Sequence, residues 1–120
     1  MSAPRVVHIS PWPPTDRRLA ELTRIFGQPV EVIELSHLDL DPAALVHAIR
    51  TAEPDAVVLA TATPDHRQAI EALANERPVL RPMFKRVRNA RGEPEDRPAG
   101  LGLLRAAGRI EPIKDGALAR

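Results

Sequence analysis

Cysteine is absent from the 120 residues of this chain, and aromatic residues make up only 2% of it. Without cysteine the chain can form neither a disulfide framework nor a reactive thiolate, which is compatible with a reducing compartment. No apolar run approaches the ~18 residues of a membrane-spanning helix. No basic-then-apolar signal segment begins the sequence either. We therefore expect a cytoplasmic protein whose core consists of Leu, Ile, Val and Ala.

Glycine-rich phosphate loops and nucleophile motifs are absent as well. The sequence has no Walker loop, no GxGxxG fingerprint, no nucleophile elbow and no catalytic-triad signature. These absences argue against a nucleoside triphosphatase and against a dinucleotide-dependent dehydrogenase. None of the four histidines has a partner at metal-ligand spacing. We expect neither a metal nor a cofactor.

Residues 56–60 are five small or branched apolar residues in a row, and this pattern is typical of a strand buried on both faces of a parallel sheet. Thr63, Pro64 and Asp65 follow, and they suit an N-cap, a first helical position and an acidic first turn. A buried strand thus leads directly into a helix N-terminus. Open α/β sheets bind phosphates and nucleotides at such places.

Two similar strand–helix units come before this one. Residues 5–10 and 30–35 predict strands, the second of them nearer the sheet edge, and Thr15 and Asp41 predict the N-caps of the helices that follow. The predicted order over residues 1–78 is therefore βαβαβα, with parallel strands and right-handed crossovers.

The C-terminal part has a different pattern. Residues 79–88 predict a fourth strand that continues as a basic ribbon, in which Pro82 marks an edge or a bend. Glycine and proline make residues 89–100 a flexible turn region. Residues 101–113 fit either a short helix or a returning antiparallel strand, and their position after a turn favours the strand. Residues 114–120 are expected to be a frayed tail.

These elements predict an α/β fold: one Rossmann-like three-layer domain over residues 1–120, with a mainly parallel sheet of four strands and a C-terminal antiparallel β-hairpin. The core covers residues 1–78 and the basic hairpin residues 79–113. Residues 1–76 carry 6 basic and 11 acidic side chains, whereas residues 77–120 carry 11 basic and 5 acidic ones. An anionic partner would meet the C-terminal part, although a solvated basic hairpin explains the asymmetry equally well.

Several polar and aromatic residues fall at the predicted carboxyl edge of the sheet. Trp12 lies in a proline-rich loop after the first strand, at the same edge as Thr61 and Thr63. Its ring could stack on a nucleobase, an interaction worth ~1–3 kcal/mol, or could cover a helix end or a dimer interface. His66, in the first turn of the third helix, is the histidine best placed for a functional role. His8 lies within a strand and is most simply a hydrogen-bonded core or interface residue.

Basic residues follow at the end of the fourth strand. Lys85, Arg86 and Arg88 carry the charges that suit phosphate oxygens. Strand alternation puts Arg86 and Arg88 on one face and Lys85 on the other, so they cannot all serve one site without a bulge. The alternative interpretation is a solvated basic edge strand that discourages aggregation.

The order and spacing of these features resemble a known family. A Ser-Pro loop beginning at Ser10, a threonine-rich loop at residues 61–63, and a Pro-Met-Phe-Lys-Arg strand at residues 82–86 that leads into a basic hairpin resemble the small stand-alone CARF-like accessory proteins and ring nucleases of type III CRISPR systems. The resemblance covers most of residues 5–110. The proline-heavy first loop departs from it, because it lacks a glycine for close backbone approach to phosphate.

The resemblance implies a homodimer whose two sheet edges form a basic pocket for a cyclic oligoadenylate, a second messenger of antiviral defence. Some members cleave the ring without a metal, through attack of a ribose 2′-hydroxyl on its own phosphate, and others only bind it. The protein then holds the nucleophile in line and stabilises the developing charge. On this chain the implied catalytic residues are Thr63, Lys85 and Arg86, and the implied ligand contacts are Ser10, Trp12, Thr61 and Thr63. From their own positions beside the site, His66 and Arg88 are added to the expected ligand contacts.

Two further functions stay open at this level. A protein of the same shape could bind the ring without cleaving it, as a sensor or a sponge, because positioning rather than residue identity decides cleavage. A plain interaction module with a basic hairpin is the third possibility. We expect neither a membrane nor DNA as a partner. A general RNA binder is also disfavoured, because Phe84 is the only aromatic residue of the basic segment, too few for a stacking platform.

Overall fold

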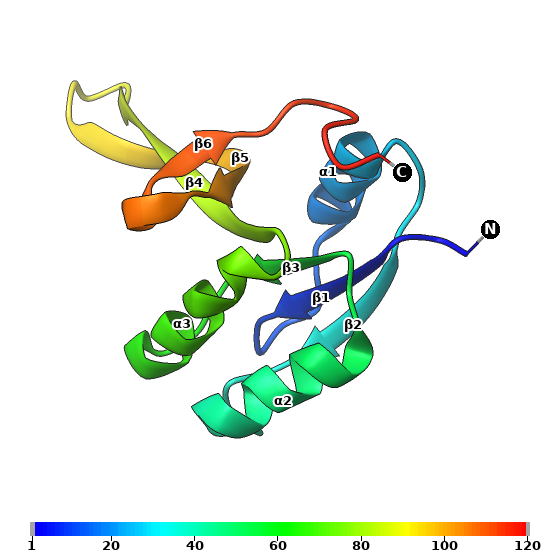
Figure 1. The fold of residues 1–120 in the computed structure, drawn as a ribbon. Coiled ribbons are helices and arrows are strands. Elements are labelled where there is room, and N and C mark those ends of the chain that lie inside the picture. Colours follow the sequence, from blue (N-terminus) through cyan, green and yellow to red (C-terminus); the bar gives the residue numbers. More distant parts are fainter. Residues whose placement is uncertain (1, 120) are drawn as a thin grey trace.

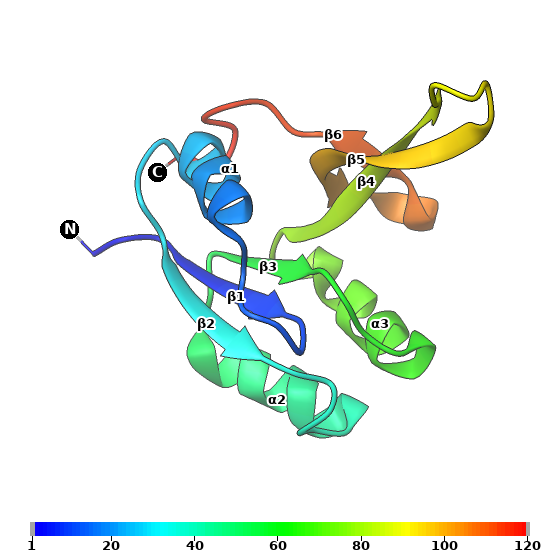
Figure 2. The same cartoon turned by 180° about the vertical axis from the view of Figure 1, so that it is seen from behind.

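In the computed structural model, which describes residues 2–119, six strands form one mixed sheet in the order β2-β1-β3-β4-β5-β6. Helix α1 packs on one face of the sheet, and α2 and α3 pack on the other (Figures 1 and 2). Along the chain the elements are β1 (Arg5–Ile9), α1 (Asp16–Phe26), β2 (Glu31–Leu35), α2 (Pro42–Ala52), β3 (Ala56–Leu59), α3 (Pro64–Glu71), η1 (Ala72–Asn75), β4 (Val79–Arg88), β5 (Pro94–Leu104), η2 (Ala106–Gly108) and β6 (Ile110–Pro112).

The predicted α/β class is confirmed, and so is the parallel arrangement of the first four strands. β5 then pairs antiparallel with β4, as the predicted hairpin requires. The sixth strand is a correction. Residues 101–113 do not form one returning strand, because they contain the end of β5, the 3-10 turn η2 and β6, which pairs antiparallel with β5.

The helices begin where the sequence predicts. The N-caps Thr15, Asp41 and Thr63 each accept a hydrogen bond from an amide in the first turn of their helix. Gly27 ends α1 in the left-handed conformation, with φ of 72°. The third helix has only eight residues, and its continuation η1 is a 3-10 turn.

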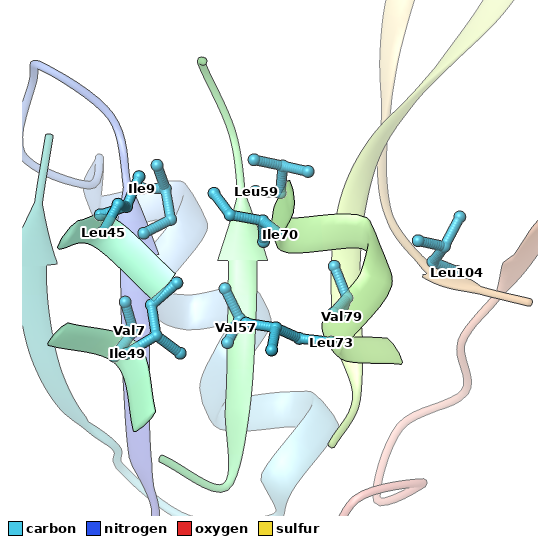
Figure 3. Packing of buried hydrophobic residues seen from close by; sticks show 10 residues of the cluster. All are labelled: Val7, Ile9, Leu45, Ile49, Val57, Leu59, Ile70, Leu73, Val79 and Leu104. Carbon is cyan, nitrogen blue, oxygen red and sulfur yellow. The ribbon is translucent and has the colours of Figure 1, made fainter. Parts of the chain in front are cut away.

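The sheet divides the apolar core into two layers. Figure 3 shows buried side chains of the layer that α2 and α3 cover: Val7, Ile9, Leu45, Ile49, Val57, Leu59, Ile70, Leu73, Val79 and Leu104. The layer beneath α1 contains Val6, Leu22, Ile25, Phe26, Ala56, Val58, Leu80 and Leu101. Strand alternation along β1 thus directs Val7 and Ile9 toward α2 and α3, and Val6 and His8 toward α1.

The two halves of β4 have different neighbours. Val79 and Leu80 pair with β3, whereas beyond Leu80 only β5 pairs with this strand. Pro82 lies in the second half, where its missing N–H interrupts no ladder with β3. β4 is therefore an inner strand at its start and an edge strand beyond it. The second half projects with β5 as a two-stranded ribbon (Figure 1).

The ribbon is longer than the sequence predicts. β5 begins at Pro94, so the flexible turn predicted over residues 89–100 is wrong for its second half. The actual turn is short, and the side-chain oxygen of Asn89 accepts two main-chain hydrogen bonds within it. Further along, β5 has an extra residue relative to β4, and Gly100 takes φ of 87° at this bulge.

The frayed tail predicted over residues 114–120 is also wrong for its described part. The main-chain N–H groups of Gly116 and Leu118 donate to carbonyls in the last turn of α1, at 2.7 and 3.1 Å. Leu118 is partly buried against the layer beneath α1. The segment stays in place because it covers apolar surface at the end of that helix. Residue 120 lies outside the described residues.

Candidate functional site

The strand order changes direction between β1 and β3. From β1 the chain crosses to β2 on one side, and from β2 it returns to β3 on the other side of β1. The N–H groups of Ala60 and Thr61 donate to the carbonyl of Ile9, at 3.2 and 3.0 Å, which holds the two strand ends together. The following helices, α1 and α3, lie on opposite faces (Figure 2). Open α/β sheets bind ligands in the crevice at such a switch point.

A hollow of about 190 Å³ lies at this crevice. Its lining comes from the end of β1, the proline-rich loop, the first turn of α1 and the end of β3: His8, Ser10, Trp12, Pro13, Pro14, Thr15, Arg18 and Ala60. A second hollow, of about 200 Å³, lies between α1 and β5 and shares Thr15 and Arg18 with the first. The first turn of α1 therefore connects the switch point with the ribbon.

Two polar side chains of the first hollow lack hydrogen-bond partners within residues 2–119. His8 is only 4% exposed and its Nδ1 has no partner, and Nη1 of Arg18 is buried without one. Burial, and next the positive charge of Arg18, lower the pKa of His8 to about 4, so its ring is neutral near neutral pH. Burial also lowers the pKa of Arg18, but a guanidinium stays charged in proteins. The hollow thus contains a charged donor beside a neutral imidazole.

The structure brings Ser10 and Trp12 to this hollow. The buried side-chain oxygen of Ser10 accepts a hydrogen bond from the N–H of Trp12, at 3.2 Å, so Ser10 shapes the loop. The Trp12 side chain is 66% exposed. An indole so exposed does not serve to cover a helix end of its own chain. Stacking on a base and contact with a second copy remain as its two interpretations.

Thr63 and His66 are bonded to each other at the start of α3. The Thr63 hydroxyl lies 2.5 Å from Nδ1 of His66, and Nε2 lies 2.6 Å from the carbonyl oxygen of Leu40. Since a carbonyl only accepts, Nε2 donates, and in the neutral ring Nδ1 then accepts from the hydroxyl. These bonds join α3 to the loop before α2, and a ligand that used either side chain would have to replace one of them. Thr61, in contrast, is exposed at the crevice.

The basic residues of the ribbon differ in what they contact. Nε of Arg86 lies 3.0 Å from Oδ1 of Asp96, and Nη1 of Arg88 donates to the carbonyl of Gly92 at 2.6 Å. Lys85 is exposed and has no ion pair among the described residues. Only Lys85 of the three therefore keeps its charge wholly available, although the Arg86 pair is itself exposed and exchangeable.

The face of the ribbon that carries Arg86 is the face turned toward α1. Leu80 packs in the layer beneath α1, so alternation along β4 places Phe84 and Arg86 on that side and Lys85 on the opposite side. Pro98, the cross-strand neighbour of Phe84, lines the second hollow against α1. Phe84 is 65% exposed. Trp12 and Phe84 are thus two exposed rings beyond the carboxyl ends of the inner strands.

Sequence reasoning missed Arg18 as a site residue and placed His8 in the core or an interface. The signals for both are positional. Arg18 comes three residues after the N-cap Thr15, in the first turn that faces the crevice. His8 is the last inward-facing position of β1 on the α1 side before the loop, two residues from Ser10. A polar residue at such a position borders the crevice rather than the centre of the core.

No family model matches this chain, and no curated protein matches its sequence. In the part of the chain that the structure describes, the helices are too short or too polar to cross a membrane. In the same part, no three histidine, aspartate or glutamate side chains lie together as metal ligands would. The site has to be interpreted from its own geometry.

Proposed function

We propose that this protein binds a cyclic oligoadenylate at the crevice between β1 and β3, as a homodimer, and cleaves the ring by metal-independent attack of a ribose 2′-hydroxyl. The observation that carries the proposal is the convergence of Trp12, Ser10 and Arg18 at the switch point of a parallel sheet. A nucleotide is recognised by a ring that stacks on its base and by a cation for its phosphate. This hollow has both, and the resemblance to CARF-like ring nucleases names the kind of nucleotide.

The symmetry of the ligand supports a pair of chains. A cyclic oligoadenylate repeats one nucleotide around a ring, so two equal half-sites related by a two-fold axis suit it. Each copy of the chain offers one exposed ring at Trp12 and another at Phe84. In a chain with so few aromatic residues, two that stay exposed at one end of the sheet suit contact with bases or with the second copy.

The proposed cleavage needs no residue that forms a bond to the substrate. The 2′-oxygen bonds to the adjacent phosphorus, and the bond from phosphorus to the 5′-oxygen breaks. The proton that the 2′-hydroxyl loses is balanced by one that the 5′-oxygen takes up, so the product is linear and ends in a 2′,3′-cyclic phosphate. The protein holds the 2′-oxygen in line and stabilises the charge on phosphorus. We assign the charge to Arg86 of one copy and to Lys85, on the opposite face of the ribbon, of the other copy, and the positioning of the phosphate to Thr63.

Binding without cleavage is the second candidate, and two contacts favour it. The Thr63 hydroxyl is bonded to His66, and Arg86 is paired with Asp96. Two of the three residues assigned to cleavage are thus engaged within the chain. A protein in which these contacts persist would hold the ring intact, as a sensor or a sponge.

The test is incubation of the purified protein with cyclic tri-, tetra- and hexa-adenylate in EDTA, followed by mass spectrometry of the nucleotide and of the native complex. Linear products establish cleavage and its ring size, provided that Lys85→Ala with Arg86→Ala, purified in the same way, releases none. An intact ring bound at one per dimer establishes the second candidate. Failure to bind any of the three rings contradicts both.

A further inference from the structure

The hollow at the switch point contains two buried polar atoms that the described chain leaves unbonded. Nη1 of Arg18 and Nδ1 of His8 both lack a partner within residues 2–119. They come from different elements, α1 and β1, and both side chains line the same hollow. Buried polar atoms of native proteins are almost always hydrogen-bonded, so an unbonded pair that lines one hollow is available to a ligand or to water.

Arg18 is the cation of the pair. Its Nε lies 3.6 Å from Oε1 of Glu21, and Asp16 is the acidic residue of the same helical turn. The other carboxylate oxygen of Glu21 accepts a hydrogen bond from the N–H of Leu101, which ties that side chain to β5. The Nη1 atom of Arg18 is buried and has no hydrogen-bond partner among the described residues, although the side chain as a whole is 21% exposed. A guanidinium nitrogen in this position suits the oxygen of a phosphate.

The start of α1 adds a second attraction at the same place. Thr15 accepts a hydrogen bond from the N–H of Arg18, and the first helical bond runs from the N–H of Leu19 to the carbonyl of Thr15. The first two amides of the helix come before these bonds and remain at its positive end. Since α1 has 11 residues, its N-terminus favours an anion.

We propose that Arg18, His8 and the first turn of α1 form a binding site for a phosphate oxyanion, and that this site holds one phosphodiester group of the bound nucleotide. The identity of the nucleotide rests on the proposed function, whereas the oxyanion site rests on the hollow alone. The site lies at the base of the crevice, and the ribbon residues lie beyond the sheet edge.

An anion in this hollow changes the state of His8. In the chain without an anion, burial and Arg18 keep the pKa of His8 low. Glu34 is the charged residue of the neighbouring strand β2 in register with His8, and the register partner on β3 is the apolar Val58. A phosphodiester on Arg18 offsets this repulsion and attracts the protonated ring, so the pKa of His8 rises, while burial, the larger cause, still lowers it. Binding is therefore expected to tighten as the pH falls, because a protonated His8 ring is a second donor.

The experiment is an NMR titration of the full chain with inorganic phosphate and, separately, with cyclic tetra-adenylate, in which the ring signals of His8 are followed. Arg18→Gln is expected to lose at least tenfold in affinity for both probes. The matched control is Arg24→Gln, which removes the same charge from the exposed last turn of α1 and should change affinity less than twofold. Arg18→Lys keeps the positive charge but not the paired N–H donors of a guanidinium. We expect its loss of affinity to lie between those of Arg24→Gln and Arg18→Gln.

The outcomes separate this inference from the proposed function. Equal affinities of Arg18→Gln and Arg24→Gln overturn the oxyanion site. If cyclic tetra-adenylate binds without any change at His8, the proposed function stands and the oxyanion site falls. If inorganic phosphate shifts His8 and cyclic tetra-adenylate does not bind, the site stands and the proposed function falls. Should Arg18→Gln fail to fold, the wild-type His8 signals and Arg18→Lys decide the matter.

Discussion

A carboxylate oxygen of Glu21 accepts a hydrogen bond from the main-chain N–H of Leu101 at 2.6 Å and so joins α1 to β5 across 80 positions of the chain. The acceptor comes from a helix because the bulge at Gly100 interrupts the ladder of β5 next to this N–H. The same carboxylate lies beside Arg18. One side chain therefore fixes the distance between α1 and the ribbon at the edge of the candidate site.

Removal of this acceptor should destabilise the fold. Glu21→Ala leaves the partly buried N–H of Leu101 without a bond to a charged group, and we expect a loss of about 1.5–3 kcal/mol in the free energy of unfolding. Urea unfolding measures it. Glu21→Gln retains an acceptor oxygen and should lose less than Glu21→Ala. Wild-type stability of Glu21→Ala would show that the bond contributes nothing.

The bulge residue should tolerate no side chain. At Gly100 φ is 87°, and a methyl group would lie 2.5 Å from a carboxylate oxygen of Glu21. Gly100→Ala therefore combines backbone strain with a clash, and we expect a loss of more than about 2 kcal/mol. Gly92→Ala is the matched control, because φ is 77° there and nothing lies within 4 Å. It should lose only the strain, about 1 kcal/mol. Equal losses in the two variants would contradict the close approach of Glu21.

Stability should fall in mild acid because of His8. Its pKa is about 4 in the folded chain and 6.5 as a free side chain, so between these values the unfolded chain binds more protons than the folded one. Folding is then favoured at high pH, and stability falls as the pH drops from 6.5 toward 4. One such proton contributes at most about 1.4 kcal/mol per pH unit. Thermal unfolding across this range measures the slope.

The matched variants for this slope are His8→Gln and His47→Gln. The first should flatten the pH dependence between 4 and 6.5, whereas the second, at an exposed position of α2, should leave it as in the wild type. A wild-type slope in His8→Gln would assign the pH dependence to other groups.

Thr63 should matter to the fold whether or not it contacts a ligand. Thr63→Val removes the N-cap of α3 and the hydroxyl that bonds to His66, and we expect a loss of about 1–2 kcal/mol. Thr61→Val, at an exposed position two residues earlier, should change stability by less than about 0.5 kcal/mol. Melting temperature and affinity for cyclic tetra-adenylate are measured side by side. A stability loss with unchanged affinity would leave Thr63 with a structural role only.

The basic ribbon should contribute to binding and hardly to folding. Lys85→Ala with Arg86→Ala removes two exposed charges, and the lost pair between Arg86 and Asp96 costs about 1 kcal/mol or less. Affinity for cyclic tetra-adenylate should fall below detection. The matched control is Arg105→Ala with Arg109→Ala, which removes the same charge at exposed positions next to η2 and should leave affinity within about threefold. A similar loss in both double variants would indicate a general charge effect rather than a site.

The sequence predicts those parts of the fold that depend on local chemistry. Thr15, Asp41 and Thr63 are followed by helices because a cap acts within one turn of its own chain. The start of β5 has no such local signal, since residues 94–97 are exposed and mostly charged. They form a strand only because β4 pairs with them. Pro82, in contrast, predicts an edge through its own chemistry, because it has no N–H to donate. It lies just beyond the point where β4 stops pairing with β3.

In the candidate site, too, local sequence predicts some residues, whereas tertiary packing determines others. Ser10 and Trp12 are predictable because they directly follow a buried strand at a sheet edge. Arg18 is not, because its burial results from the packing of α1 over the last inward position of β1, which His8 occupies. That contact joins two elements whose sequences show no sign of it. The bonds of His66 to the Thr63 hydroxyl and to the Leu40 carbonyl are also unpredictable, because the second of them joins residues 26 positions apart.

The dependence of the α1 layer on residues 113–118 has a consequence for how the chain folds as it is made. The layer covered by α2 and α3 consists largely of residues that precede the end of β4. The layer beneath α1 also contains Leu101 and has Ile113 and Leu118 packed against it. A ribosome delivers Ile113 and Leu118 after every described strand has been synthesised, and domains fold as the chain emerges from its N-terminus. The half of the core that supports Arg18 and His8 is thus the last to close, so a shortened or stalled chain would hold a sheet but no finished site.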